Sequence, residues 1–353
     1  MKVYNNLYSK VISVENLFQA WAEFRSDKQQ KPDVMKFERH LEENIFDLHH
    51  LLRKKQYEHG AYQAFYIHDP KQRLIHKATI QDRVLHHAIF KVLNPVFEPT
   101  FIAHSFSCRI GKGTHKGVAA LATMLRKISK NNTKPCFALK CDVRKFFATV
   151  DQDILFSILQ KRIQDEDMLK LLHKIVYSFN RTGAPHKGIP IGNLTSQLFA
   201  NIYMNELDQF VKHQLRVKHY VRYTDDFVIV ADNTQYLQGL LPKIQEFLRD
   251  VLLLELHPNK ISIRKFSQGI DFLGYVVLPN YSVLRTKTKR RILSKLDNNI
   301  QGLKNGAVSE GYFHQSLQSY LGVLSHANSY NVEQNIKNKV WYELSTEEID
   351  LLL

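Results

Sequence analysis

The chain has 353 residues, of which 44% are hydrophobic and 24% are charged, the composition of an ordinary globular protein. Its 49 lysine and arginine residues exceed its 34 aspartate and glutamate residues, and the formal charge of +15 is spread along the chain. This charge favours a nucleic acid partner over a membrane, although a solvated basic surface has the same composition. The sequence has no apolar run long enough to span a bilayer and no secretory layout at its start. We therefore expect a cytoplasmic protein with no membrane partner.

Cysteine and histidine give no metal-binding pattern. Cys108, Cys136 and Cys141 form no C-x-x-C pair, so reduced thiols are expected. The doublets His49-His50 and His86-His87 lack zinc-ligand spacing, and we interpret them as surface and packing residues.

The first hundred residues predict helices interrupted by a short β region. Apolar side chains recur at three- and four-residue intervals at Phe37, Leu41, Ile45, Leu48, Leu51 and Leu52. Short β-like runs follow on either side of the Asp69-Pro70 turn, which is accompanied by Lys71, Arg73 and Lys77. Helical periodicity returns in "DRVLHHAIFKVLNPVF" and is expected to stop near Pro95.

The middle of the chain predicts a strand that ends in a carboxylate. "SFSCRIGKGTHKG" is a basic, glycine-punctuated loop without P-loop spacing, and a helix is expected over residues 118–128. In "CFALKCDVRKFFATV", apolar residues alternate with Ala138, Lys140 and Asp142, which is the period of a strand.

A helix and a hairpin are predicted next. "LTSQLFANIYMNELDQFVKHQL" is amphipathic, and Asn193 or Thr195 could cap it. "VKHYVRY" and "FVIVADN" predict a hairpin with Thr224, Asp225 and Asp226 at its tip. A helix over 235–256, a strand near 261–263, the apolar "IDFLGYVVL" and a basic helical segment from 285 complete the chain.

Two adjacent carboxylates between apolar strands need a positive partner. A lone Asp-Asp pair is more often an ordinary turn. If Asp142 lies beside Asp225 and Asp226 in one sheet, however, three carboxylates converge, and two Mg²⁺ ions roughly 3.5–4 Å apart would hold them. The implied chemistry is phosphoryl transfer, with Mn²⁺ as a possible substitute for Mg²⁺.

Several segments, in this order, resemble motifs of reverse transcriptases. The segments are "DPKQRLI", "IQDRVLHHAI", "SFSCRIGKGTHKG", "ALKCDVRKFFATVD", "GIPIGNLTSQLFANIY", "RYTDDF", "LHPNKISI" and "IDFLGY". The upstream ones are similar to the bacterial branch that includes group II intron and retron enzymes. The resemblance implies an α+β right-hand polymerase: an N-terminal helical region and fingers over 1–136, a palm with an antiparallel sheet over 137–284 (151–187 partly fingers), and a helical thumb over 285–353.

The resemblance also implies roles for individual residues. Asp142, Asp225 and Asp226 would bind the two metal ions, and Lys260 would protonate the leaving pyrophosphate as a general acid. Phe147 matches the aromatic steric gate that excludes a 2′-hydroxyl, although a core aromatic is the alternative. The remaining nucleotide-binding candidates are Arg73, Lys77, Ile191, Gly192, Ser196, Gln197 and Tyr223, and the primer-grip candidates are Phe272, Leu273 and Gly274. Arg73 and Lys77 would clamp the triphosphate, but both could instead be solvated charges.

The second of the catalytic motifs departs from the pattern of many relatives. Ile191 stands where they have Gln, and Ser196-Gln197 stands where they have Ser-Pro. This pattern resembles reverse transcriptases of diversity-generating retroelements. It implies an enzyme that is error-prone at template adenines and makes cDNA from a template RNA to diversify a gene. The implied partners are template RNA, primer, cDNA, deoxynucleotides and a small basic accessory protein. An ordinary strand-end aliphatic residue is the alternative reading of Ile191.

Two other functions remain open on the sequence. A retron-type or phage-defence reverse transcriptase would share the same motifs. A basic RNA-binding scaffold with a vestigial palm would bind RNA in a salt-sensitive manner without turnover.

Overall fold

The computed structural model describes residues 2–69, 71–180 and 183–344. Contacts within the chain define two units. The first consists of Met1–Ile110, Cys141–Phe227 and Gly239–Ile261, and the second of Gly111–Lys140, Val228–Gln238 and Ser262–Leu353. Among the described residues, no helix has the length and apolar composition needed to cross a bilayer.

The first unit is mainly helical. Its helices are α1 (Tyr8–Ile12), α2 (Val14–Arg25), α3 (Pro32–Glu38), α4 (Leu41–Arg53), α5 (Ile80–Phe97), α7 (Phe146–Thr149), α8 (Gln152–Gln160), α9 (Glu166–Val176) and α10 (Leu194–Gln209). Short helical turns follow at Glu98–Thr100, Phe210–Gln214 and Pro258–Lys260. Ser13, Thr79, Asp151 and Asp165 cap α2, α5, α8 and α9 by accepting backbone N–H groups, which explains where these helices begin.

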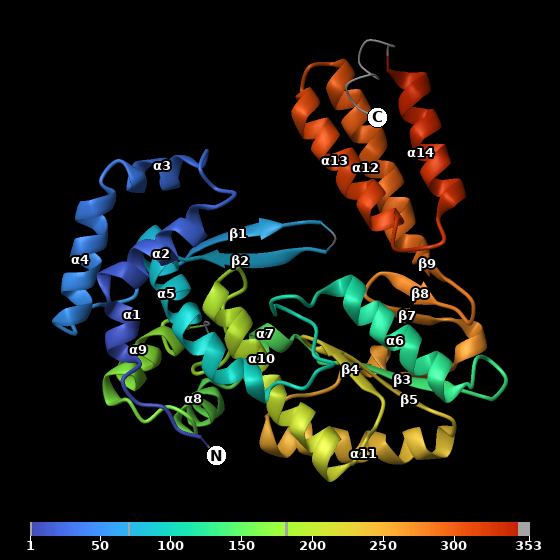
Figure 1. Ribbon diagram of the computed structural model, residues 1–353, viewed down its shortest axis with the longest axis horizontal. Coiled ribbons are helices and arrows are strands. Elements are labelled where there is room, and N and C mark those ends of the chain that lie inside the picture. Colours follow the sequence, from blue (N-terminus) through green and yellow to red (C-terminus); the bar gives the residue numbers. More distant parts are fainter. Residues whose placement is uncertain (1, 70, 181–182, 345–353) are drawn as a thin grey trace. The chain divides into compact units, whose positions relative to one another are not determined.

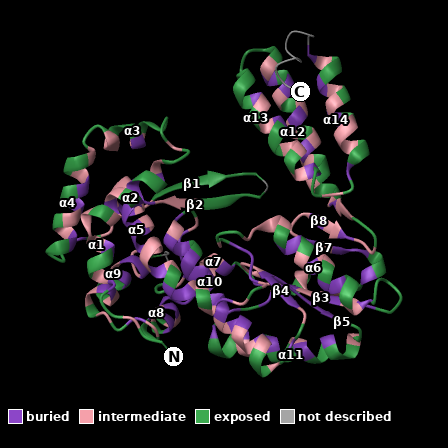
Figure 2. Cartoon of the chain, viewed as in Figure 1, coloured by how far each residue is buried: buried purple, intermediate pink, exposed green. Residues whose placement is uncertain are grey.

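The core of this unit forms around α5, which packs against α2 and α10. The apolar positions predicted to recur between Phe37 and Leu52 form part of this core. Ile45, Leu48 and Leu52 are fully buried, whereas Phe37 is only half-buried. The predicted β-like runs are confirmed as β1 (Gln63–Ile67) and β2 (Arg73–Lys77), which pair in an antiparallel hairpin with Ile67 opposite Arg73. Figure 2 shows exposed residues all along β1, so this hairpin contributes little to the core.

A four-stranded sheet in the order β4-β5-β3-β6 carries the predicted strands. Its strands are β3 (Phe137–Asp142), β4 (Tyr220–Tyr223), β5 (Asp226–Ala231) and β6 (Ser262–Lys265). β3 and β6 are antiparallel, with Phe137 opposite Lys265. Every residue of β5 after Asp226 is buried, which is why this strand reads as a continuous apolar run.

The second unit holds a second small sheet and a helical group. It contains α6 (Thr114–Ile128), a helical turn at Phe266–Gln268, and the antiparallel sheet β7 (Ile270–Phe272), β8 (Tyr275–Val277) and β9 (Ser282–Leu284). α12 (Thr286–Lys304), α13 (Glu310–Leu324) and α14 (Tyr330–Glu343) contact one another and lie side by side in Figure 1. Their shared core consists of Ile292, Leu296, Ile300, Phe313, Leu317, Leu324, Ile336 and Val340. The helix α11 (Thr234–Val251) has residues in both units.

The predicted end of α5 near Pro95 is confirmed, since the helix ends two residues later at Phe97. Two other predicted boundaries are wrong. α6 begins at Thr114 rather than at 118, after Gly113 with φ of 119° turns the chain. α11 ends at Val251 rather than at 256. The overall α+β class with antiparallel sheets is confirmed.

Candidate active site

The tip of the β4–β5 hairpin lies against the residues that follow β3. Thr224 takes a left-handed conformation with φ of 53°, and Asp225 completes the turn. The backbone N–H of Val143 donates to the Asp225 carbonyl at 3.1 Å. Since Val143 directly follows Asp142, this bond fixes the backbones that carry two of the predicted catalytic carboxylates against each other.

The electrostatics of the tip depend on burial and like charge. The pKa of Asp225 is raised to about 6, first because the side chain is buried and second because the Asp142 carboxylate repels its charge. The cations Lys260 and Arg73 act in the opposite direction but do not cancel the shift. An ionised Asp225 is therefore unfavourable here unless a further positive charge is present.

Lys260 supplies one positive charge directly to Asp142. Its ammonium group donates to Asp142 Oδ1 at 2.6 Å, and the backbone N–H of His257 donates to the Asp142 carbonyl at 2.7 Å. The helical turn Pro258–Lys260 thus places Lys260, the predicted general acid, in contact with Asp142, a predicted metal ligand.

A buried ion pair that the sequence analysis missed supports the tip. The Arg222 guanidinium donates from Nε and Nη2 to the two carboxylate oxygens of Asp208 on α10, at 2.7 and 2.6 Å. Both side chains are fully buried, and Tyr220 also donates to Asp208 at 2.8 Å. Burial lowers the pKa of Arg222, but Asp208 more than offsets this effect and leaves the pKa raised. An arginine within an otherwise apolar strand was the available sequence signal for a buried partner.

The same arginine reaches the turn itself. Arg222 Nη1 donates to the Thr224 carbonyl at 2.9 Å, and the Thr224 hydroxyl donates to Ser107 at 2.6 Å. The backbone N–H of Arg222 donates to the His104 carbonyl at 3.0 Å, and that of Phe106 donates to the Arg222 carbonyl at 3.0 Å. The first residues of the loop "SFSCRIGKGTHKG" therefore support the turn, and their role is to position it.

Phe147 lies at the start of the short helix α7, after Lys145 in a left-handed conformation with φ of 48°. Its ring meets Phe146 edge to face at 5.4 Å, but only Phe146 is buried. The Phe147 carbonyl accepts from the Ile189 N–H at 2.8 Å. The half-buried Phe147 ring is thus the one of the pair available to a ligand.

The segment with the unusual second motif is held by β2. The backbone N–H of His76 donates to the Ile191 carbonyl at 3.1 Å. Gly192 follows with φ of 115°, and a Cβ there would lie 2.9 Å from Ile75 Cγ2. Glycine is required at 192 for both conformation and space.

The other nucleotide-binding candidates differ in availability. Arg73 is exposed on β2, whereas Lys77 forms an ion pair with Asp33. Ser196 is buried in the first turn of α10, and Gln197 beside it is exposed. Tyr223, the last residue of β4, is half-buried. Lys77 would have to leave Asp33 in order to bind a triphosphate.

The donor chemistry at Asp142 and Asp225 fits a divalent cation. Carboxylate oxygens are preferred Mg²⁺ ligands, and a cation would relieve the repulsion that raises the pKa of Asp225. Within the described ranges, however, no group of three or more His, Cys, Asp or Glu side chains is arranged to hold a metal ion. The convergence of Asp142, Asp225 and Asp226 on metal ions therefore stays a prediction.

The predicted primer-grip residues belong to the second unit, in the turn between β7 and β8. Leu273 and Gly274 form this turn with φ of 52° and 91°, and Phe272 is fully buried. Asp271, the residue before Phe272, forms an ion pair with Arg285. These contacts give the turn a defined shape, and its role with a primer stays a prediction.

Comparison with known proteins identifies the family. Residues 53–277 match the family model described as "Reverse transcriptase (RNA-dependent DNA polymerase)". The chain belongs to this family.

Relatives of known sequence include Protein YkfC of Escherichia coli, which is 23% identical over 232 residues, covering 56% of this chain and 60% of that protein. The group II intron-encoded protein LtrA of Lactococcus lactis is 24% identical over 296 residues, covering 64% of this chain and 48% of that protein. The chain thus spans about half to three fifths of the length of these relatives.

A solved structure supports the fold. Telomerase from Candida albicans, solved with a fragment of telomeric RNA, matches with a TM-score of 0.52 at 12% identity, covering 84% of this chain and 56% of that chain. At this identity the likeness concerns the fold alone. Together with the family match it confirms the right-hand polymerase fold.

Proposed function

We propose that this protein is an RNA-directed DNA polymerase that extends a primer on an RNA template with deoxynucleotides. The observation that carries the proposal is the Val143–Asp225 backbone bond, which joins the ends of β3 and of the β4–β5 hairpin. Family membership and the charge of +15 support a nucleic acid substrate.

Asp142, Asp225 and Asp226 are the residues that would hold two divalent cations, Mg²⁺ or Mn²⁺. Bound there, the cations would supply activation of the primer hydroxyl and charge neutralisation at the triphosphate. Lys260 holds Asp142 in place through its 2.6 Å bond and carries a proton close to the reacting groups. Phe147 would line the sugar pocket, and Arg73 would contact the triphosphate.

Primer extension on RNA tests the proposal. The double variant Asp225→Asn/Asp226→Asn should lose extension by several orders of magnitude, whereas Asp47→Asn on the exposed surface of α4 should keep it. Full extension by the double variant would refute the assignment. Salt-sensitive RNA binding by an inactive wild-type protein would favour the RNA-binding scaffold instead.

We further propose that the enzyme belongs to the diversity-generating type, with errors at template adenines and a small basic accessory protein. The aliphatic Ile191 beside Gly192 supports this, because a side chain without polar groups offers only shape discrimination. The DNA next to the gene distinguishes this type from a retron-type or phage-defence enzyme. Near-identical repeats that differ at adenines favour it, and their absence favours the alternatives.

A further inference from the structure

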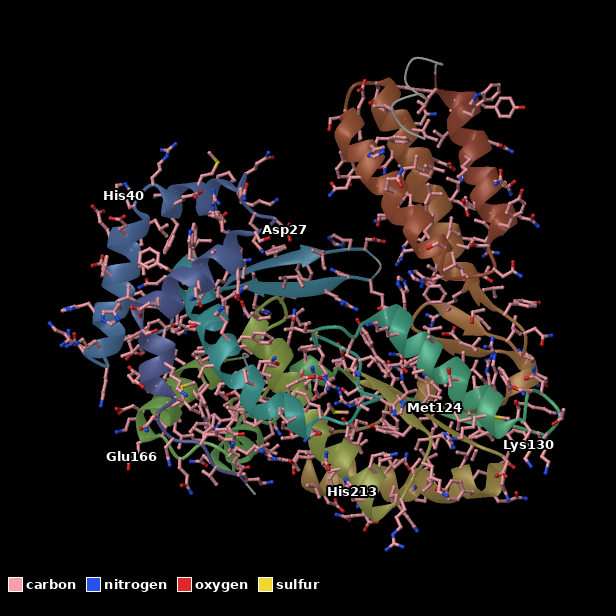
Figure 3. All side chains as sticks on the ribbon, viewed as in Figure 1. Asp27, His40, Met124, Lys130, Glu166 and His213 are labelled. Carbon is pink, nitrogen blue, oxygen red and sulfur yellow. The ribbon has the colours of Figure 1, made fainter. Side chains whose placement is uncertain are left out.

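A group of exposed lysine and arginine side chains surrounds the loop between α6 and β3 in the second unit. Its members, which we call the basic patch, are Arg126, Lys127, Lys130, Lys134 and Lys265. Figure 3 labels Lys130 just beyond the end of α6, in the loop that leads to β3. None of the five side chains forms an ion pair or a hydrogen bond with any residue that the structure describes.

The sequence around the basic patch lacks compensating negative charge. No aspartate or glutamate lies between Glu98 and Asp142. The pKa of Cys136, next to the patch, is raised to about 12, first by burial and second by the carboxylate of Asp232, so Asp232 offsets part of the positive charge. Ordinary protein surfaces mix charges of both signs, whereas like charges repel one another unless a polyanion neutralises them. The basic patch therefore favours an anionic partner.

A pocket with a volume of about 310 Å³ lies within the basic patch. Two patch members, Lys134 and Lys265, line it together with the hydroxyl-bearing Thr133 and Ser267. The Thr133 hydroxyl donates to the Lys130 carbonyl at 2.8 Å, so its oxygen remains available as an acceptor. Ammonium and hydroxyl groups donate to phosphate oxygens, and a threonine oxygen can accept from a ribose 2′-hydroxyl. The pocket therefore suits the sugar–phosphate backbone of a nucleic acid.

The backbone of the loop is fixed before any partner binds. Lys130, Asn131 and Asn132 all take left-handed conformations, with φ of 47°, 54° and 69°. The Ser129 hydroxyl accepts from the Asn132 N–H at 3.0 Å, and the Ser129 carbonyl accepts from the Lys134 N–H at 2.8 Å. A loop that is already ordered loses little conformational entropy on binding, which favours affinity. Lys130 and Lys134 are thus presented on a preformed backbone.

The side chains of this surface distinguish between kinds of polyanion. Within the described residues of 111–140 and 262–268, no aromatic or large aliphatic side chain is exposed. Single-stranded nucleic acids stack on exposed aromatic side chains, and membrane-surface helices insert apolar ones. Double-stranded RNA is instead recognised through its phosphates and 2′-hydroxyl groups. A surface of cations and hydroxyl groups therefore fits duplex RNA.

The basic patch lies at the end of β3 that is remote from the catalytic carboxylates. β3 begins beside the pocket at Phe137 and ends at Asp142, and a strand of this length spans about 17 Å. β6 runs antiparallel to β3 and places Lys265 opposite Phe137, at the same end. An RNA segment on the basic patch is thus separate from the primer terminus.

We propose that the basic patch binds the phosphate backbone of a double-stranded segment of RNA that lies outside the primer–template. Lys130, Lys134 and Lys265 contact phosphates along the duplex, independently of its sequence. The patch thereby holds a folded region of the template RNA while the catalytic end copies an unpaired region. The inference rests on the proposed polymerase function for the identity of the polyanion, and it adds a second RNA-binding surface.

Two primed RNA templates test the basic patch independently of catalysis. One template is unstructured beyond the primer, and the other carries, after a single-stranded linker, a hairpin of about 16 base pairs, the length that a duplex-binding domain spans. Fluorescence anisotropy in chelator, without deoxynucleotides, measures the affinity for each. Wild-type protein should bind the hairpin-bearing template about tenfold more tightly, the effect of one charge-assisted hydrogen bond.

The double variant Lys130→Asn/Lys134→Gln should abolish this hairpin preference. It should also reduce the salt slope of binding to the hairpin-bearing template by about 1.8, the contribution of two duplex phosphate contacts. The variant should melt like wild type, because asparagine tolerates the left-handed conformation at 130. Lys10→Gln/Lys243→Gln, at two exposed lysines elsewhere, removes the same charge and should keep the preference. Primer extension on the unstructured template should be unchanged in both double variants.

Equal affinity of wild-type protein for the two templates would overturn the inference, even if primer extension is intact. The same holds if the folded patch variant keeps the hairpin preference, or if the control variant loses it to the same extent. Loss of binding to phosphatidylserine vesicles with an unchanged hairpin preference would make the patch a membrane site instead. If the hairpin preference is present but primer extension is absent, the proposed function fails and the basic patch stands as an RNA-binding surface.

Discussion

Arg222 and Asp208 form a fully buried, bidentate ion pair, with Nε–Oδ1 and Nη2–Oδ2 distances of 2.7 and 2.6 Å. The pair connects α10 to the strand that carries the Asp225 turn, because Arg222 also donates to the Thr224 carbonyl. The position of Asp225 thus depends on a carboxylate from another element.

Removal of one member of this pair should destabilise the protein strongly. Asp208→Asn should lower the free energy of unfolding by about 3–5 kcal/mol, because it leaves a buried guanidinium uncompensated. Urea denaturation measures this loss. On the same helix, Glu206→Gln breaks only the exposed pair with Lys161 and should cost less than about 1 kcal/mol. Equal losses in the two variants would contradict the role given to the buried pair.

Asp225→Asn should have the opposite effect on stability. Folding raises the pKa of Asp225 from 3.8 to about 6, so the native state holds this proton more tightly than the unfolded state. Stability therefore falls as pH rises between these values, and the full penalty, at most about 3 kcal/mol, is present above pH 6. In the presence of a chelator of divalent cations, Asp225→Asn should melt at a higher temperature than wild type at pH 8. Below pH 4 the two melting temperatures should be similar. A lower melting temperature at pH 8 would show that Asp225 stabilises the turn instead.

Lys260 can be tested as a proton donor and as a charge partner of Asp142. Lys260→Arg keeps the positive charge next to Asp142 but cannot readily release a proton. If Lys260 acts as a general acid, both Lys260→Arg and Lys260→Gln should lower the single-turnover rate by about 10²–10⁴. Near-normal rates in Lys260→Arg with a loss only in Lys260→Gln would assign Lys260 an electrostatic role.

Phe147→Ala should relax sugar selectivity. Only Phe147 of the Phe146–Phe147 pair is accessible, so truncation should admit ribonucleotides while leaving the core intact. The ratio of kcat/KM for deoxynucleotide over ribonucleotide measures the change. Phe146→Ala, which should cost about 3–5 kcal/mol of stability, is the contrasting variant. Unchanged sugar selectivity in Phe147→Ala would show that Phe147 is not the steric gate.

Sequence patterns predicted the local elements of the site and missed its long-range partners. The alternation before Asp142 and the two apolar runs around Asp225 identified the strands, because strand periodicity is a property of neighbouring residues. The Arg222–Asp208 pair was not predictable in this way, since burial of a charge depends on a partner from another element. Asn193 shows the same limit: it precedes α10 as predicted, but its side chain bonds the His76 carbonyl and makes no cap bond. His86 was expected to be a packing residue and is buried, but periodicity could not reveal that neither of its ring nitrogens has a hydrogen-bond partner among the described residues.

Ile191→Gln should lower misincorporation opposite template adenine. The backbone at 191 is held by the His76 N–H, independently of its side chain, so the substitution should leave Gly192 in place. Glutamine would add a hydrogen-bonding group beside the nascent pair, and a polar contact discriminates better than shape alone. Sequencing of cDNA made on a defined RNA measures the error spectrum, with Ile110→Gln as the control at an exposed position. An error spectrum at adenines identical to that of wild type would remove Ile191 from the explanation and weaken the case for the diversity-generating type.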